Sequence, residues 1–288
     1  MGKQGIKKNI AGGKASNYVA KNSSIKAKRR ASREDIKRKV IKISYGLFHT
    51  LSDLILWEAV FFTELGSASK GRPYAFLYKA QEKYDYFDKA KIRDALYNLK
   101  RKGLLLSLAL GLKEELITAE AHKRLNRILP RYDHKRIWDK RVYLVTYDIP
   151  EEQKAKRNLL YQFLKKSKCA LLQRSVWISI FNPKKTIREF VQKNNIEGQI
   201  IVSDLGPDGS IGDKDLKELL AEIYNLHDLN KRYSEFCHKT SKAVSIYERK
   251  QLNFLYLSIL RDDPQLPFTL LPLDWQGDKA FLLYRKIA

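Results

Sequence analysis

Cysteine is scarce in this sequence, which has only two, Cys169 and Cys237, among its 288 residues. The two lie far apart and without ligand-like spacing, which argues against both a disulfide framework and a cysteine zinc site. So few thiols fit a reducing compartment. The five histidines are also scattered, with none at metal-ligand spacing, and we expect them at the surface.

Long apolar runs are missing as well. The longest nearly apolar stretches, residues 54–62 and 104–112, are far shorter than the roughly 20 residues that span a bilayer. The first thirty residues lack the apolar core of a signal peptide. The glycines of residues 66–72 do not make a phosphate-binding loop, because no strand precedes them and no Lys-Ser/Thr follows. We therefore expect a cytoplasmic protein without a membrane partner.

Acidic residues are outnumbered: 32 Asp and Glu stand against 56 Lys and Arg, which gives a formal net charge of +24. An excess of this size concerns partners rather than fold, and it favours polyanions, with nucleic acid first. Apolar residues make up 44% of the chain, so most of it can bury a core. Its length favours two or three domains.

The basic residues are concentrated at the start of the chain. Residues 1–39 contain thirteen Lys or Arg and two acids. Because such a segment cannot bury enough apolar surface to offset its ordering entropy, we predict that residues 1–40 are disordered alone. A solubilising tail is one interpretation. We favour a DNA-binding arm that follows phosphates and releases counterions, with Lys28, Arg29 and Arg30 as its candidate contacts.

Residues 44–125 have the pattern of a winged helix. We predict three helices, then a hairpin, then a further helix from Thr118. In that fold the third helix enters the major groove and the hairpin lies against the DNA backbone. The predicted helices span residues 44–64, 74–83 and 89–102, and the hairpin strands span residues 104–110 and 114–117.

The third helix carries the candidate reading residues. Asp88 can cap its start and Gly103 can close its end. A solvated amphipathic helix would also have a charged outer face. We favour a reading helix because aromatic and amide groups stand among the basic ones, and Arg and Asn can recognise guanine and adenine. The candidates are Lys89, Lys91, Arg93, Tyr97, Asn98, Lys100 and Arg101, with Lys113 in the hairpin turn.

The rest of the chain has a different periodicity. After a basic linker at 126–140, residues 141–205 show the order β-α-β-β-α-β of a ferredoxin-like domain, which we expect to dimerise. Trp177, on one of its strands, is our candidate for a dimer contact or for its support. Residues 213–288 are predicted to be mainly helical. The sequence thus predicts an α+β protein.

The predicted ferredoxin-like domain resembles the CRISPR-associated small endonuclease family, whose members are homodimers. The resemblance lies in VYLVTYDIPEEQKAKRNLLYQFLKK and the following LLQRSVWIS, including the Gln-x-Ser-Val segment at 173–176. It implies that Asp148, at the end of the first strand, corresponds to a proposed magnesium ligand. The alternative is that Asp148 accepts hydrogen bonds from backbone N–H groups at the start of the next helix, and we favour this alternative.

The whole arrangement is similar to the phenylacetic acid degradation repressor family, of PaaX type. Its members combine a winged helix, a domain similar to the CRISPR nuclease, and a C-terminal helical region with a Leu-Pro-x-x-Leu-Leu-Pro-x-x-Trp-x-Gly pattern. The resemblance implies a repressor with an aryl-acetyl coenzyme A effector. The matching residues are Leu266, Pro267, Leu270, Leu271, Pro272, Trp275 and Gly277.

We therefore predict a homodimeric, nucleoid-associated transcriptional regulator that binds an inverted repeat in double-stranded DNA, without a cofactor and without enzymatic activity. One alternative is a Mg²⁺-dependent nuclease that uses Asp148, supplied twice by a dimer. Another is a sequence-blind architectural DNA binder that depends on its basic arm.

Overall fold

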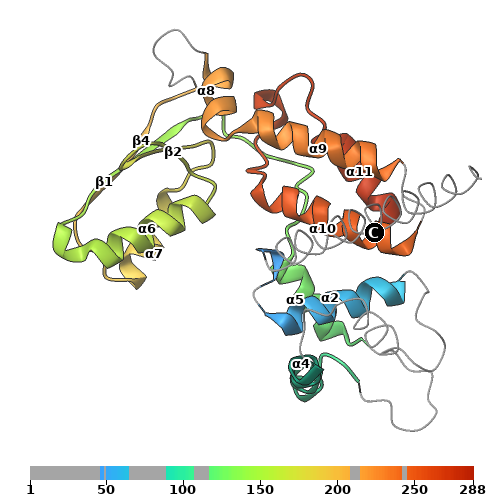
Figure 1. The fold of residues 1–288 in the computed structure, drawn as a ribbon. Helices are drawn as coiled ribbons and strands as arrows, with labels where there is room; N and C mark the ends of the chain where they lie inside the picture. Colours follow the sequence, from blue (N-terminus) through green and yellow to red (C-terminus); the bar gives the residue numbers. More distant parts are fainter. Residues whose placement is uncertain (1–45, 49, 65–88, 107–116, 208–214, 242–244) are drawn as a thin grey trace, which may run out of the picture. The chain divides into compact units, whose positions relative to one another are not determined.

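The computed structural model describes residues 46–48, 50–64, 89–106, 117–207, 215–241 and 245–288 (Figure 1). The chain divides into two compact units, residues 1–122 and residues 123–288. In the described part of the chain helices predominate, and the strands form a four-stranded antiparallel sheet. The α+β class predicted from the sequence is therefore confirmed. The predicted helix at 74–83 and the predicted arm lie outside the described residues.

Helix α2 (Leu51–Glu64) forms the apolar centre of the first unit. It is buried around most of its circumference from residue 53 to residue 61, as its composition predicts. Trp57 stacks on Phe61 with 5.0 Å between ring centroids. Residues 46–47 are also helical, but Phe48 and Thr50 are not, so the single helix predicted over 44–64 is interrupted before Leu51. Thr50 caps α2, because its hydroxyl accepts a hydrogen bond from the Asp53 amide at 3.1 Å.

Helix α4 (Lys89–Arg101) packs against α2 through one apolar face. Gly103 ends the helix as predicted, in a left-handed conformation with φ +64°. The Gly103 amide donates to the Lys100 carbonyl at 2.9 Å, and the Leu104 amide donates to the Leu99 carbonyl at 3.0 Å. These two bonds form a Schellman motif, which fixes where the chain leaves the helix. The buried face consists of Ile92, Ala95, Leu96 and Leu99.

The second unit contains the sheet, with strand order β2-β3-β1-β4 and antiparallel pairing throughout. Helices α6 and α7 follow the first and third strands in the chain and lie on the same side of the sheet (Figure 1). The order of the elements along the chain is the one predicted. These elements are β1 (Tyr143–Asp148), the 3-10 helix η1 (Glu151–Gln153), α6 (Lys154–Lys166), β2 (Ala170–Gln173), β3 (Val176–Ser179), α7 (Lys184–Lys193) and β4 (Gln199–Asp204).

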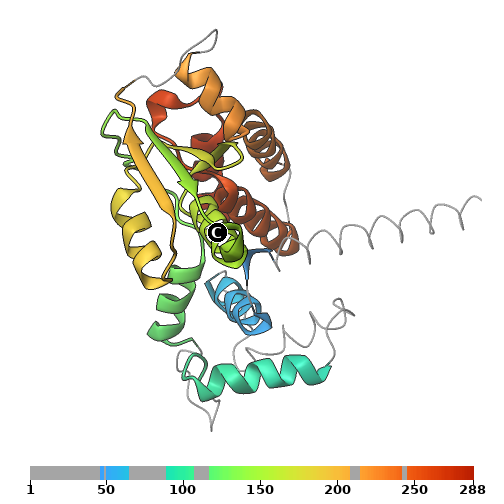
Figure 2. The same cartoon turned by 90° about the vertical axis from the view of Figure 1, so that its left-hand side faces the viewer.

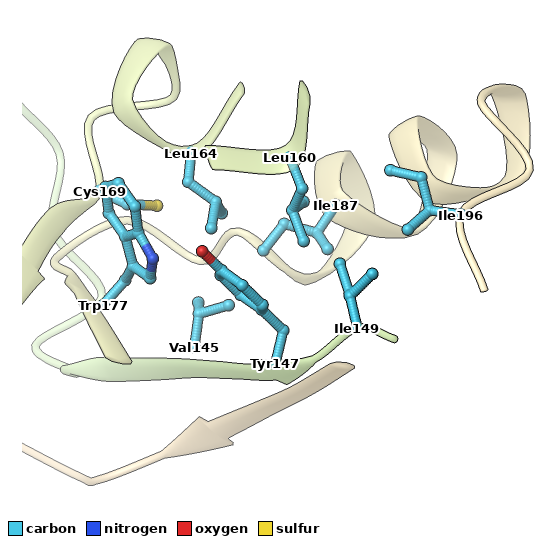
Figure 3. Packing of buried hydrophobic residues seen from close by; sticks show 9 residues of the cluster. All are labelled: Val145, Tyr147, Ile149, Leu160, Leu164, Cys169, Trp177, Ile187 and Ile196. Atoms are coloured by element: carbon cyan, nitrogen blue, oxygen red, sulfur yellow. The ribbon is translucent and has the colours of Figure 1, made fainter. Parts of the chain in front are cut away.

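A hydrophobic core joins the sheet to these two helices. Val145 and Tyr147 on β1 point toward Leu160 and Leu164 on α6 (Figure 3). Trp177 on β3 belongs to the same core and is only 1% exposed. Its side chain is therefore inside the domain and not a direct dimer contact; it acts as a core residue.

The C-terminal region is helical, as predicted, and its three long helices run side by side (Figures 1 and 2). Tyr256 on one helix stacks on Tyr284 of another at 4.2 Å. Ser245 begins the second long helix with a capping box that includes Glu248. The elements are α8 (Leu216–Ile223), α9 (Leu226–Thr240), α10 (Ile246–Asp262), the 3-10 helix η2 (Phe268–Leu270) and α11 (Gly277–Ile287).

The Leu-Pro pattern that follows α10 is a packing motif. Leu266, Leu270 and Leu271 are buried. A Cβ atom added to Gly277 would lie 2.4 Å from the Trp275 indole nitrogen, so the Trp-x-Gly spacing lets the indole lie against the backbone at the start of α11. This motif thus packs the segment that connects α10 to α11.

The segment predicted as a basic linker, 126–140, is structured. Helix α5 (Ala119–Ile128) occupies its start. Tyr132 stacks on Phe281 of α11 with 4.1 Å between ring centroids. Arg136 is 3% exposed. Besides being basic, this segment contains a tyrosine and an arginine that pack against residues more than 120 positions away.

Candidate nucleic-acid interface

The exposed face of α4 carries most of the predicted reading residues. Arg93, Tyr97 and Arg101 follow one another at four-residue intervals, so their side chains lie along one stripe of the helix. All three are exposed, and Tyr97 is 66% exposed. A tyrosine that is two-thirds exposed contributes little to the core, and its ring is available for contacts outside the domain.

Other predicted residues flank this stripe. Lys100 borders it on one side, and Lys91 and Asn98 border it on the other, as helical geometry requires. Lys91 and Lys100 are exposed, whereas Asn98 is half-buried. The Asn98 side-chain oxygen accepts a hydrogen bond from Arg101 at 3.4 Å. Asn98 therefore helps to orient Arg101 and is less accessible than the sequence suggests.

Helix α4 carries much more positive than negative charge. The helix has five basic residues and one acid, Asp94, and two of the basic residues, Lys100 and Arg101, lie in its last turn. Cations in the last turn interact favourably with the helix dipole. Guanidinium groups on an exposed helix can bind phosphates or the edge of guanine. The face has the chemistry of a nucleic-acid contact.

The two segments that flank the predicted hairpin turn meet just after the end of α4. Leu105 and Ile117 form an antiparallel bridge, and the Thr118 hydroxyl donates to the Gly103 carbonyl at 2.8 Å. Thr118 also caps α5 by accepting a hydrogen bond from the Ala121 amide at 3.2 Å. The two ends of the predicted hairpin are thus held together directly behind α4.

Several predicted contacts lie outside the described residues. They are Lys28, Arg29 and Arg30 of the arm, Lys113 of the hairpin turn, and the side chain of Lys89, whose backbone begins α4.

Asp148, the candidate magnesium ligand, is exposed at the end of β1, where it pairs in register with Gln199. The helix that follows starts after Pro150 without a side-chain cap, so the capping role that we expected for Asp148 is not observed. A group of three or more His, Cys, Asp or Glu residues that could hold a metal ion is not found among the described residues. The described part of one chain therefore does not supply Asp148 with two further side chains of these types to hold a metal ion.

Sequence reasoning missed a buried polar cluster in the second unit. The Asp263 carboxylate accepts hydrogen bonds from the Tyr233 hydroxyl at 2.9 Å and from the Gln265 amide at 2.6 Å. The Arg136 guanidinium lies 4.0 Å from it and donates to the Leu266 carbonyl at 3.2 Å. Burial raises the pKa of Asp263 above its ordinary value. Nothing local in the sequence marks Tyr233 and Arg136 as partners of Asp263, since both lie far from it in the chain.

These features define an α+β protein with a basic, exposed helix in one unit and an antiparallel sheet packed with helices in the other. Residues 135–216 match the family model described as the PaaX protein central Cas2-like domain. This match confirms, for this part of the chain, the resemblance to the PaaX-type family and to the CRISPR-associated endonucleases.

A solved structure described as uncharacterized protein Rv0674 from Mycobacterium tuberculosis is similar to this chain at 15% identity and a TM-score of 0.48. The similarity covers 70% of this chain and 81% of that one. Among curated proteins none matches the sequence. In the described part of the chain, each helix is too short or too polar to cross a membrane.

Proposed function

We propose that the protein is a homodimeric transcriptional repressor that reads an inverted-repeat operator in double-stranded DNA. The observation that carries this proposal is the exposed stripe of Arg93, Tyr97 and Arg101 on α4, in a chain whose central part matches a PaaX domain. Members of that family are regulators, and the function needs neither a metal nor another cofactor. Under this proposal the protein acts in the cytoplasm, bound to the DNA of the nucleoid.

The first unit is proposed to be a winged helix with α4 as its reading helix. Two observations support this: α4 packs on the apolar helix α2, and the ends of the following hairpin are bridged through Leu105 and Ile117. In a winged helix this order puts the reading helix into the major groove and the wing on the backbone. Lys113 and the arm would then bind phosphates, which position the protein without reading sequence.

The second unit is proposed to contain a ferredoxin-like dimerisation domain, for which the strand order β2-β3-β1-β4 and the two helices on one side of the sheet are the support. A two-fold dimer presents two reading helices related by the same symmetry, so its operator is an inverted repeat. The family resemblance adds an acyl coenzyme A thioester as the effector that releases the repressor.

A selection experiment tests this function. The full-length protein is incubated at near-physiological salt, with Mg²⁺, with a pool of duplexes that carry a randomised segment, and both bound and cleaved DNA are sequenced. We expect intact bound DNA enriched in an inverted repeat. Cleaved DNA without enrichment would instead support the nuclease, and intact bound DNA without enrichment would support a sequence-blind binder.

A further inference from the structure

The second unit contains a cavity of about 740 Å³, within the range of roughly 300–1,000 Å³ that is usual for small-molecule sites. Its walls come from segments far apart in the sequence. Tyr161 on α6 and Tyr224 after α8 supply aromatic surface, and residues 261–264 at the end of α10 supply another wall. The cavity therefore has aromatic as well as charged residues in its walls.

The residues that line this cavity carry an excess of positive charge, because three lysines and an arginine face two acids. Lys165, Lys166 and Lys168 line it. In the described part of the chain none of the three lysines forms an ion pair, although Lys168 lies over the Phe181 ring at 5.3 Å. Burial lowers the pKa of Lys168, so its ammonium group is short of solvation and would gain from an anionic partner.

The two acids that line the cavity are already engaged. Asp262 forms ion pairs with Arg232 at 2.8 Å and with Arg261 at 3.1 Å. Asp263 is held by Tyr233 and Gln265, as described above. Neither acid forms an ion pair with the three lysines, although Asp263 attracts Lys168 at longer range.

We propose that this cavity binds a small organic anion, with its carboxylate, phosphate or sulfonate on Lys168 and the neighbouring lysines and its apolar part against Tyr161 and Leu171. The claim that the bound anion is an effector rests on the proposed regulatory function. The claim that the cavity binds an anion rests on the residues of the cavity alone.

The position of Asp263 gives the ligand a way to influence the rest of the unit. Asp263 lines the cavity and interacts electrostatically with both Lys168 and Arg136. Its neighbour Gln265 holds the segment after α5, because the Gln265 side chain accepts from the Asp133 amide at 2.6 Å and donates to the Arg131 carbonyl at 2.8 Å. An anion bound at Lys168 reduces the positive field at Asp263 and so acts on this network.

The test uses 1-anilinonaphthalene-8-sulfonate, a fluorescent aromatic anion, as the probe for the full-length protein. We expect saturable binding that Lys168→Met weakens by about tenfold, because the variant cannot form the charge-assisted hydrogen bond to the sulfonate. Lys165→Met, a second lysine that lines the cavity, serves as a further variant and should also weaken binding. Lys193→Met, an exposed lysine on α7 that does not line the cavity, is the matched control and should bind the probe like the natural protein.

Two further measurements separate the site from the function. The uncharged N-phenyl-1-naphthylamine should show no difference between Lys168→Met and the control, since it lacks the anion. Thermal unfolding establishes that each variant is folded. Equal affinity of the sulfonate for both cavity variants and the control would overturn the proposal. If the variants lose the sulfonate while the natural protein has no DNA preference, the cavity site stands and the regulatory function fails.

Discussion

The Asp263 carboxylate lies 4.0 Å from the Arg136 guanidinium, and both side chains have no solvent-exposed surface. Arg136 also lies over the rings of Tyr132 and Phe268, at 4.9 and 4.6 Å. One buried cation thus joins the segment after α5 to the motif after α10. The pair binds two parts of the second unit that are about 130 residues apart in sequence.

Replacing one member of this pair should be strongly destabilising. Arg136→Met leaves Asp263 buried without its cation, which typically costs about 3–5 kcal/mol. Urea unfolding of the natural protein and the variant measures the difference. Lys185→Met removes a surface ion pair with Glu189 and is the control, with an expected change within about 1 kcal/mol. A loss of similar size in both variants would mean that the buried pair does not anchor the segment.

The pair should also produce a pH dependence of stability. Burial raises the pKa of Asp263 above its ordinary value of 3.8, which the unfolded chain keeps. Between these two pKa values the folded protein holds a proton that the unfolded chain has released. The contribution of Asp263 is therefore fully present below pH 3.8 and is lost as the pH rises through the raised pKa.

Asp263→Asn removes this titration. The free energy of unfolding of the variant, minus that of the natural protein, should therefore increase as the pH rises from 3.8 through the raised pKa of Asp263. Urea titrations at several pH values provide the comparison. A difference that is constant with pH would show that Asp263 has the same pKa in both states.

Gly198 has no room for a side chain beside the backbone of Asp148. Its φ is +126°, and an added Cβ would lie 2.5 Å from the Asp148 carbonyl oxygen. Gly198→Ala should therefore cost more than about 1 kcal/mol. Gly206→Ala is the control: Gly206 also has a positive φ, +80°, but nothing lies within 4 Å of the added Cβ. Equal losses in chemical denaturation would mean that only backbone strain matters at Gly198.

Removal of residues 1–39 should change the salt dependence of DNA binding more than its sequence preference. For each phosphate that the truncated protein no longer neutralises, the slope of log K against log salt becomes shallower by about 0.9. Titrations of labelled DNA at several salt concentrations measure this slope. Replacing Lys28, Arg29 and Arg30 by Gln should reproduce part of the change. If the truncation instead abolishes nearly all affinity, the protein is a sequence-blind binder.

Local patterns explain what could be predicted from the sequence. The spacing of Ile92, Leu96 and Leu99 and the glycine at 103 are sufficient for α4 and its end, because helical periodicity and capping act within a few residues. The order β-α-β-β-α-β predicted for residues 141–205 also matches the observed order of strands and helices. The interruption before α2 was not predicted, because the cap at its start depends on a single hydroxyl, that of Thr50.

Long-range relationships could not be predicted in this way. Arg136 stands in a basic run and has no local feature that distinguishes it from its exposed neighbours, yet it is buried by residues from the end of the chain. Trp177 lies on a strand whose two faces are both partly apolar, so the sequence alone did not decide between core and interface. The cavity has the same origin, because its walls are assembled from α6, β3 and the end of α10.

The most direct measurement of DNA reading by α4 compares base preference between variants of this helix. Arg93→Ala and Arg101→Ala are each assayed against the selected operator and against operators with single base changes, with Arg285→Ala on α11 as the control. We predict that each α4 variant loses about 1–3 kcal/mol of discrimination at particular base pairs, whereas the control keeps it. Unchanged base preference in both α4 variants would show that this helix does not read DNA.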